Sequence, residues 1–407
     1  MTMRGSSTDT ADGAAEALPW RTVSLMSLGA FASSGMTRLL DPLLPRLVHD
    51  YGVSLGQAAW SVTAFATAYG LMQLLYGPLA DRRGKLRVMS WAAAFAAVAA
   101  LGCVLARGSL PAFIAARALA GAFCAASIPL AMAWIGDAIP YAQRQPVLAR
   151  FMIGQMLGMA SGQLLGGLAA EQAWWAWPFL FYALVFVIVA TLLARQREPA
   201  NALTVLPGHP GQALMEVLRQ PWARVVLLTT FAEALCYLGA FTYLVTHLHR
   251  EGGASLAVAG STMMAFSLGG MAFAFLARGW VTHLGEARLA VIGSLLAAAS
   301  MAVVAVDATL WLAAPAIFVS GVGFYMLHNT LQTNATQMMP ARRGAAVALF
   351  ATCFFIGQSV GVSLLGVVAD HYGTRPVLLF GALMLVPIGL RFGRRLRRRQ
   401  LALAVAA

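Results

Sequence analysis

Apolar residues fill long runs along this chain, and the runs are separated by short stretches rich in glycine, proline and charge. Each run has about 20 residues, the length that an α-helix needs to cross the hydrocarbon core of a bilayer. The twelve runs that we count centre near Ala32, Ala66, Ala97, Ala125, Gly158, Val185, Leu235, Ser267, Ala298, Val322, Gln358 and Leu385. The pattern predicts an all-α integral membrane protein with twelve transmembrane helices.

The composition agrees with this prediction. Only 11% of the 407 residues are charged and 60% are hydrophobic, whereas a water-soluble domain carries about 25% charged residues. Residues 1–19 are polar and contain no apolar run followed by a cleavage site, so we interpret them as a disordered cytoplasmic tail. The four cysteines lie inside apolar runs at spacings that suit neither a metal site nor a disulfide framework, and we expect no metal site.

Basic residues indicate how the chain is oriented, because cytoplasmic loops collect lysine and arginine during insertion. If the N-terminus is cytoplasmic, most of the 28 Lys and Arg residues fall on that side, and the loop residues left outside are Arg46, Arg107, Arg250 and Arg375. We therefore expect both termini in the cytoplasm of a bacterium, with the protein in its inner (plasma) membrane. The net charge of +13 follows from these loops and from the C-terminal run RFGRRLRRR, which also suits anionic lipid, so no nucleic-acid partner is expected.

The two halves of the chain resemble each other at an offset of about 200 residues. The recurring pairs include Phe65 and Phe266, Gly84 and Gly285, Gly121 and Gly321, and Pro140 and Pro340. Transporters are often built from such repeats around a site at the middle of the membrane. We predict a six-helix bundle at 20–195, a cytoplasmic linker at 196–222, a second six-helix bundle at 223–392 and a basic cytoplasmic tail at 393–407.

The polar stretch GPLADRRGKLR follows the second run. Glycines permit a tight turn there, and a carboxylate at the membrane boundary is stabilised by arginines and by a helix N-terminus. The stretch resembles the loop between helices 2 and 3 of the major facilitator superfamily, and with the repeat the resemblance covers the chain from about Trp20 to Phe392. The matching residues are Gly77, Asp81, Arg82, Gly84, Lys85 and Arg87.

This resemblance implies a gate on the cytoplasmic side. In it, Asp81 docks against the start of helix 11 near Gly344 and holds the outward-facing state. The alternative is that the stretch only sets the topology of the chain.

Four ionisable residues stand inside apolar runs, where they are costly and usually mark a pathway or a paired contact: Arg38, Asp41, Arg117 and Glu233. Arg38 and Asp41 are three residues apart and share a helix face. Arg117 precedes Gly121 by four residues, which resembles an R-x-x-x-G element of helix 4 that is linked to proton coupling in the superfamily. A buried carboxylate can hold a proton at neutral pH, and an approaching arginine expels it.

We predict that Asp41 is the main proton site, that Arg38 or Arg117 tunes it, and that Glu233 is a second acid. Alternatively, Arg38 and Asp41 form a permanent ion pair that only fixes packing, and Glu233 is a hydrogen-bonded structural acid.

Uncharged polar residues outline a possible substrate cavity, because they recur at helical spacing on single faces. They could contact a substrate or satisfy one another. The candidates are Tyr69, Gln73, Gln155, Gln163, Tyr237, Tyr325, His328, Asn329 and Gln332.

Helix 5 carries a glycine at every fourth position. The residues are Gly154, Gly158, Gly162 and Gly166, followed by Gly167. Small residues at this spacing let two helices approach closely. The segment also resembles the glycine-rich antiporter motif of drug and proton exchangers, but Gln163 stands where that motif has proline.

No phosphate-binding loop and no pair of nucleophile and base stands out, so an enzyme or an ATP-driven pump is not expected. The sequence predicts a monomeric secondary transporter without a cofactor, driven by the proton gradient, that exports a small organic compound such as a drug, a metabolite or a sugar derivative. Two alternatives stay open: proton-coupled or facilitated uptake of a sugar or organic acid, and a receptor or scaffold that does not transport. The buried ionisable residues disfavour the last one.

Overall fold

The computed structural model describes residues 18–198 and 210–406, and these contain helices and connecting turns but no strand. The first half contains α1 (Trp20–Arg38), α2 (Leu44–Tyr51), α3 (Leu55–Arg83), α4 (Lys85–Leu105), η1 (Ala106–Gly108), α5 (Leu110–Cys124), α6 (Ser127–Ala138), α7 (Tyr141–Ala170) and α8 (Trp177–Leu193).

The second half contains α9 (Pro210–Arg219), α10 (Pro221–Glu233), the π-helical turn η2 (Ala234–Leu238), α11 (Gly239–Phe241), α12 (Leu244–Arg250), α13 (Leu256–Thr262), α14 (Met264–Leu284), α15 (Glu286–Val306), α16 (Leu310–Gln337), η3 (Pro340–Arg342), α17 (Arg343–Tyr372) and α18 (Thr374–Ala406). The N-terminal tail before residue 18 and residues 199–209 of the predicted linker lie outside the described residues.

Eight helical segments of the described chain are long and apolar enough to cross a membrane, and α8 is apolar but shorter. The helices α1, α3 and α7 have 19, 29 and 30 residues but carry more polar side chains. The predicted all-helical membrane fold is confirmed, whereas the count of twelve transmembrane helices stays a prediction.

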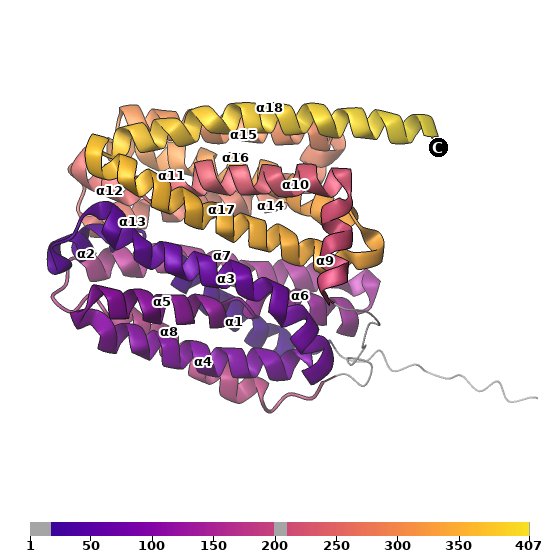
Figure 1. Ribbon diagram of the computed structural model, residues 1–407, viewed down its shortest axis with the longest axis horizontal. Helices are drawn as coiled ribbons and strands as arrows, with labels where there is room; N and C mark the ends of the chain where they lie inside the picture. Colours follow the sequence, from indigo (N-terminus) through magenta and orange to yellow (C-terminus); the bar gives the residue numbers. More distant parts are fainter. Residues whose placement is uncertain (1–17, 199–209, 407) are drawn as a thin grey trace, which may run out of the picture.

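The helices run between two ends of the molecule. We call the end at which α1 begins and α18 finishes the tail end, and the end that carries α2, α12 and α13 the far end (Figure 1). Helices of the first half gather on one side of the molecule and those of the second half on the other, with α3 beside α17 where they meet (Figure 1). The boundaries proposed for the two bundles stay a prediction.

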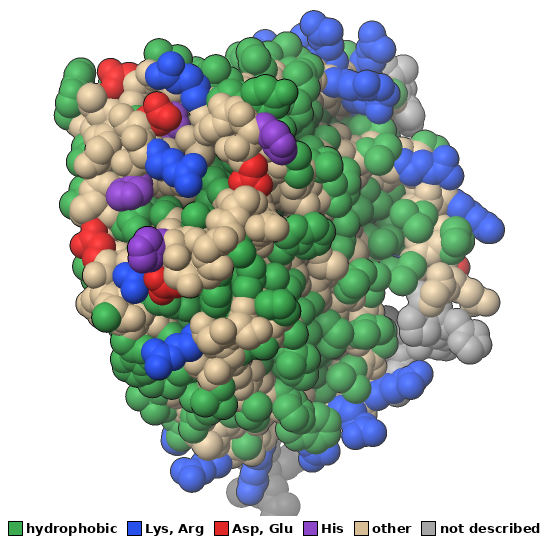
Figure 2. All heavy atoms as spheres, turned by 60° about the vertical axis from the view of Figure 1, so that its left-hand side comes forward, with side chains coloured by type: hydrophobic (Ala, Val, Ile, Leu, Met, Phe, Trp, Pro, Cys, Tyr) green, Lys and Arg blue, Asp and Glu red, His purple; other side chains and the backbone are tan. Residues whose placement is uncertain are grey.

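The outer surface between these ends is apolar. Figure 2 shows green hydrophobic side chains over much of the face between the charged groups of the two ends. Large apolar side chains that are 65–77% exposed include Phe275 and Leu383. An exposed apolar surface of this extent suits contact with hydrocarbon.

Glycines bring α1 and α7 into backbone contact. A Cβ added at Gly158, Gly162 or Gly166 would run into the backbone of Phe31, Gly35 or Leu39, respectively. Since both helices advance four residues from one contact to the next, the spacing seen in the sequence is explained by this ladder of close approaches.

The second half repeats the arrangement. Gly357 and Gly361 approach the backbone of Phe231 and Leu235 just as Gly154 and Gly158 approach Ser27 and Phe31. The pairs Gly121 with Phe65 and Gly321 with Phe266 are also equivalent close contacts. These matched contacts occur at the positions where the sequence repeats itself.

Helix starts at the far end recur as well. In α3, the Ser54 hydroxyl accepts a hydrogen bond from the Gln57 amide (3.2 Å), and the Gln57 side chain accepts one from the Ser54 amide (3.0 Å). In α13, the Ser255 hydroxyl accepts from the Val258 amide (3.3 Å). Both serines satisfy amides that a helix leaves unpaired at its start.

Candidate functional site

A buried ion pair lies at the end of α1 that faces the far end. Arg38 is the last residue of α1 and Asp41 lies in the turn before α2, with Nη1 of Arg38 3.4 Å from Oδ2 of Asp41. The Asp41 side chain is fully buried and that of Arg38 is 5% exposed. The two side chains are in contact, although Asp41 lies in the turn after α1 rather than in the helix, where the sequence analysis placed it, and its role as a proton site stays a prediction.

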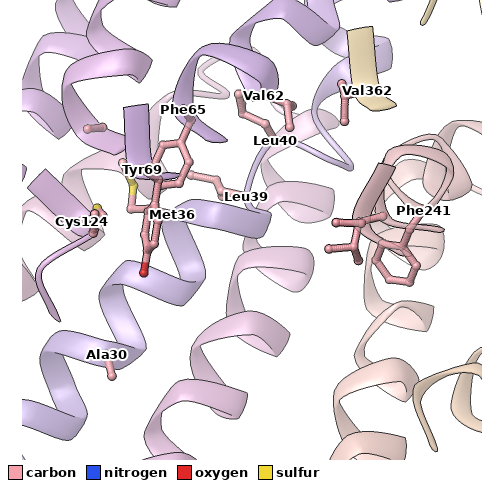
Figure 3. Packing of buried hydrophobic residues seen from close by; sticks show 14 of the residues in the cluster. Ala30, Met36, Leu39, Leu40, Val62, Phe65, Tyr69, Cys124, Phe241 and Val362 are labelled. Atoms are coloured by element: carbon pink, nitrogen blue, oxygen red, sulfur yellow. The ribbon is translucent and has the colours of Figure 1, made fainter. Parts of the chain in front are cut away.

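Arg117 is the second cation of this cluster. Its side chain is fully buried in α5, its Nη2 donates to the Met36 carbonyl (3.1 Å), and its guanidinium lies 4.2 Å from the ring centroid of Phe65. Figure 3 shows Met36, Phe65 and Tyr69 close together in the first half. A buried guanidinium over an aromatic face gains cation–π energy in place of hydration.

Hydrogen bonding in this cluster is incomplete. Nε and Nη1 of Arg117, Oδ1 of Asp41 and Oε1 of the buried Gln163 have no hydrogen-bond partner among the described residues. Buried polar atoms are nearly always paired, so a group of unpaired ones calls for a reason such as a ligand, a proton or a second conformation. The cluster of Arg38, Asp41, Arg117 and Gln163 is called the Arg–Asp cluster below.

The Arg–Asp cluster reaches the boundary between the halves. The Arg38 guanidinium lies 5.2 Å from the ring centroid of Phe241, a residue of α11 in the second half. Figure 3 shows Phe241 across from the first-half residues. A movement of one half against the other must therefore change the surroundings of Arg38.

The second half holds its own buried acid. Oε2 of the fully buried Glu233 lies 3.0 Å from Nδ1 of His328, and Oε1 has no partner among the described residues. The His328 ring stacks on Phe324 with centroids 5.2 Å apart and also contacts Phe354. Glu233 directly precedes the π-helical turn η2, a distortion that is frequent at functional sites.

Other candidate residues divide into two groups. The Tyr237 hydroxyl shares a hydrogen bond of 2.5 Å with the Ser320 hydroxyl, and Gln73 donates to the Ala125 carbonyl at 3.3 Å. The Tyr69 ring packs at a tilt against the ring of Phe355 in the second half, with centroids 4.1 Å apart. These side chains already have structural partners. By contrast, Gln155, Asn329 and Gln332 are half-buried and make no side-chain hydrogen bond with the described residues.

One contact joins α16 of the second half to α7 of the first half. The Tyr325 hydroxyl in α16 lies 3.6 Å from Sδ of Met159 in α7. On α16 the predicted polar face of Tyr325, His328, Asn329 and Gln332 is half-buried, while Met326, Leu327, Thr330 and Leu331 between them are buried. The polar face of α16 thus turns toward the boundary of the halves.

The halves are joined at the far end and in the middle. Among the described residues, hydrogen bonds between the halves extend from Ser54 and Asp370 at the far end to Gly70 and Thr352 near the middle of α3 and α17. Toward the tail end, a cavity of about 640 Å³ that is open to the outer surface lies between α7 and α14. Its lining includes Arg144, Leu148, Met152, Met156, Met271 and Phe275.

At the tail end, the polar stretch predicted as a gate has a defined geometry. Gly84 has φ +90°, a conformation that favours glycine, and Lys85 pairs with Asp137 of α6 at 2.7 Å. Asp81 makes no hydrogen bond or ion pair with the described residues, and a Cβ at Gly344 would meet nothing within 4 Å. The contact that the family resemblance implies between these two positions is absent from this conformation, so the role of Asp81 stays a prediction.

The sequence analysis missed three acids that bind the starts of helices. Glu198 accepts hydrogen bonds from the Leu86 and Arg87 amides at the start of α4, Asp370 binds the start of α3, and Glu171 binds the start of α13. Each stands just after an apolar run. That position is a weak signal, because it does not tell which helix start the acid will meet.

Comparisons with known proteins agree with this architecture. A family model described as Major Facilitator Superfamily matches residues 26–362. The chain is 27% identical to "Uncharacterized MFS-type transporter YceJ" of Bacillus subtilis over 83% of this chain and 87% of that protein. It is also 27% identical to "Multidrug export protein EmrB" of Escherichia coli, over 52% of this chain and 45% of that protein.

Solved structures show the same fold. A D-xylose–proton symporter superposes with a TM-score of 0.76 at 15% identity, over 92% of this chain and 97% of that one. A bacterial homologue of the lysosomal transporter Spinster, solved in an inward-facing and unoccupied conformation, gives 0.70 at 17% identity over 93% and 98%.

Proposed function

Because this chain belongs to the Major Facilitator Superfamily and is a multi-pass membrane transporter, we propose that it exports a small organic compound in exchange for protons. In this proposal both termini lie in the cytoplasm of a bacterium, so the tail end faces the cytoplasm and the far end faces outward. The enzyme class is excluded, since the members of this family that it matches are transporters.

The observation that carries the proposal is the position of Asp41. Its carboxylate is fully buried, one of its oxygens is unpaired, and its partner Arg38 contacts Phe241 of the other half. When the halves separate at the far end, Arg38 loses the Phe241 ring and its distance to Asp41 can change. A carboxylate whose neighbouring cation moves changes its proton affinity, which links protons to the motion of the halves.

Glu233 offers a second proton site by the same reasoning. It is fully buried, it has an unpaired oxygen, and its other oxygen lies within hydrogen-bond distance of His328. Each half thus contains one buried acid, Asp41 or Glu233. In the proposal, the transported compound passes between the two halves, along the boundary that lies near these acids.

The open cavity between α7 and α14 supports an apolar compound as the substrate. The cavity between α7 and α14 has a volume of about 640 Å³ and includes three methionines, Met152, Met156 and Met271. Methionine side chains adapt to ligands of different shape. The names of relatives such as "Multidrug export protein EmrB" support export rather than uptake.

The test is accumulation of labelled small molecules in a bacterial host depleted of its own efflux pumps. We expect lower accumulation of at least one compound in cells that express the protein, and loss of this effect in Asp41→Asn and after addition of a protonophore. The matched control is Asp307→Asn, because Asp307 is a partly exposed acid whose hydrogen bonds go only to Thr309 of its own loop. Raised accumulation would favour uptake and would contradict the proposal.

A further inference from the structure

Two acids at the far end occupy unfavourable positions on their own helices. Asp370 lies in the last turn of α17, and Glu171 is the residue that follows α7. The C-terminal end of a helix carries partial negative charge and favours cations, so an acid there is destabilised by its own helix. The placement needs an explanation outside α17 and α7.

Each acid binds the start of a helix from the opposite half. Asp370 accepts hydrogen bonds from the Ser54 hydroxyl (2.6 Å) and the Gly56 amide (3.0 Å) at the start of α3. Glu171 accepts one from the Ala257 amide (2.9 Å) at the start of α13. Helix starts carry unpaired amides and partial positive charge. Each carboxylate is therefore stabilised by the neighbouring helix, although its own helix destabilises it.

The two contacts join equivalent pairs of helices, α3 with α17 and α13 with α7, although the two acids lie about one turn apart in the repeat. The helices α3 and α13 both begin after a capping serine, Ser54 and Ser255. Each carboxylate comes from the far-end terminus of the partner helix, α17 or α7.

Near each carboxylate, the two helices are in close backbone contact at glycines, α3 with α17 and α7 with α13. A Cβ at Gly56 would lie 3.0 Å from the Gly366 carbonyl carbon, and a Cβ at Gly167 would lie 3.1 Å from the Gly260 Cα. The backbone contact keeps the carboxylate within reach of the amides. Each site therefore combines a close helix contact with hydrogen bonds between the two halves.

We infer that Asp370 and Glu171 are a matched pair of positioning residues that hold the far end closed, and that both must release before the transporter can open there. Both side chains are exposed, so water can replace the amides and hydroxyl when the halves separate. This inference goes beyond the proposed function, because it holds for export or uptake and for any substrate or coupling ion. It also differs from the gate implied for Asp81, which would act at the tail end.

The experiment measures the separation of the far ends directly. Spin labels are attached to cysteines introduced at His49 and Glu251, two exposed positions at the far end of the first and second half. The four native cysteines are first replaced by alanine, and the distance distribution is recorded in lipid nanodiscs without substrate. The variants are Asp370→Ala, Glu171→Ala and the double variant, with Asp307→Ala as the matched control.

We expect each single variant to raise the ratio of far-end-open to far-end-closed molecules about fivefold, and the double variant about 25-fold, because two separate hydrogen-bonded contacts add. Asp307→Ala should leave the distribution unchanged. If the double variant is poorly folded, Asp370→Asn with Glu171→Gln keeps acceptor oxygens but removes the charge, and should give a smaller shift in the same direction.

Distances that do not change in these variants would overturn the inference. Because the readout needs neither substrate nor a proton gradient, its failure is distinguishable from failure of the export proposal.

Discussion

The guanidinium of Arg38 lies 5.2 Å from the ring centroid of Phe241, and the two residues belong to different halves of the molecule. Arg38 also pairs with Asp41 at 3.4 Å. One cation is thus shared between an acid of its own half and an aromatic ring of the other. The balance between these two contacts depends on how the halves sit, which is the property that a coupling residue requires.

Removal of the aromatic face should disturb this balance. Phe241→Leu keeps an apolar side chain but removes the cation–π contact, which contributes about 1 kcal/mol, so we expect the transport rate to fall about fivefold. Transport is measured in proteoliposomes with an imposed pH gradient. Phe273→Leu is the matched control, because Phe273 is a buried ring of the second half that packs on Trp280 and contacts no cation among the described residues. Equal rates for both variants would contradict a role for the Arg38–Phe241 contact.

Glu233→Gln should separate coupling from binding. Glutamine keeps a hydrogen bond to His328 but cannot release a proton. We expect transport against a gradient to be lost, while exchange of labelled for unlabelled substrate across the membrane continues. If exchange stops as well, Glu233 serves binding or folding rather than proton coupling.

The glycine ladder predicts a stability effect. A methyl group at Gly158 would collide with the backbone of Phe31 in α1. Since backbone cannot move aside as a side chain can, Gly158→Ala should lower the free energy of unfolding by about 3 kcal/mol, the upper end of the usual cost of overpacking. Thermal unfolding in detergent measures this.

The matched control for the ladder is Gly136→Ala. Gly136 is also helical, but a Cβ there meets nothing within 4 Å. Alanine is the better helix former, so this variant should be as stable as the parent or slightly more stable. Equal melting temperatures for the two variants would contradict the close approach of α1 and α7.

The cap on α4 predicts a smaller effect. Glu198 satisfies the Leu86 and Arg87 amides, so Glu198→Ala should lower the free energy of unfolding by about 1 kcal/mol, the usual loss for a helix cap. Glu251→Ala is the control, since the Glu251 side chain makes no hydrogen bond or ion pair with the described residues. A loss that is the same in both variants would show that Glu198 acts only through net charge.

The fold could be predicted from the sequence because each helix has a local residue pattern that indicates it. Apolar runs of membrane length predict spans, and glycines four residues apart predict close packing, which α1 and α7 confirm. The ion pair of Arg38 and Asp41 was equally accessible, since its partners are three residues apart.

The partners of Glu233, Glu171 and Asp370 were not accessible. Asp370 and Gly56 are 314 residues apart along the chain, and no local pattern tells which helix start faces which acid. The same limit explains why Gln73 and Tyr69, predicted as cavity residues, have structural partners instead. Polarity on a helix face signals that a side chain turns inward, but the packing of other helices decides what it meets.

The ladder between α1 and α7 has a mechanical consequence. It consists of backbone against backbone, so it contains no side-chain rotamers that could absorb a displacement. The two helices should therefore behave as one stiff lever. A small tilt imposed at Glu171 would therefore be transmitted past Arg38 and as far as Ser27, where the backbone contacts end.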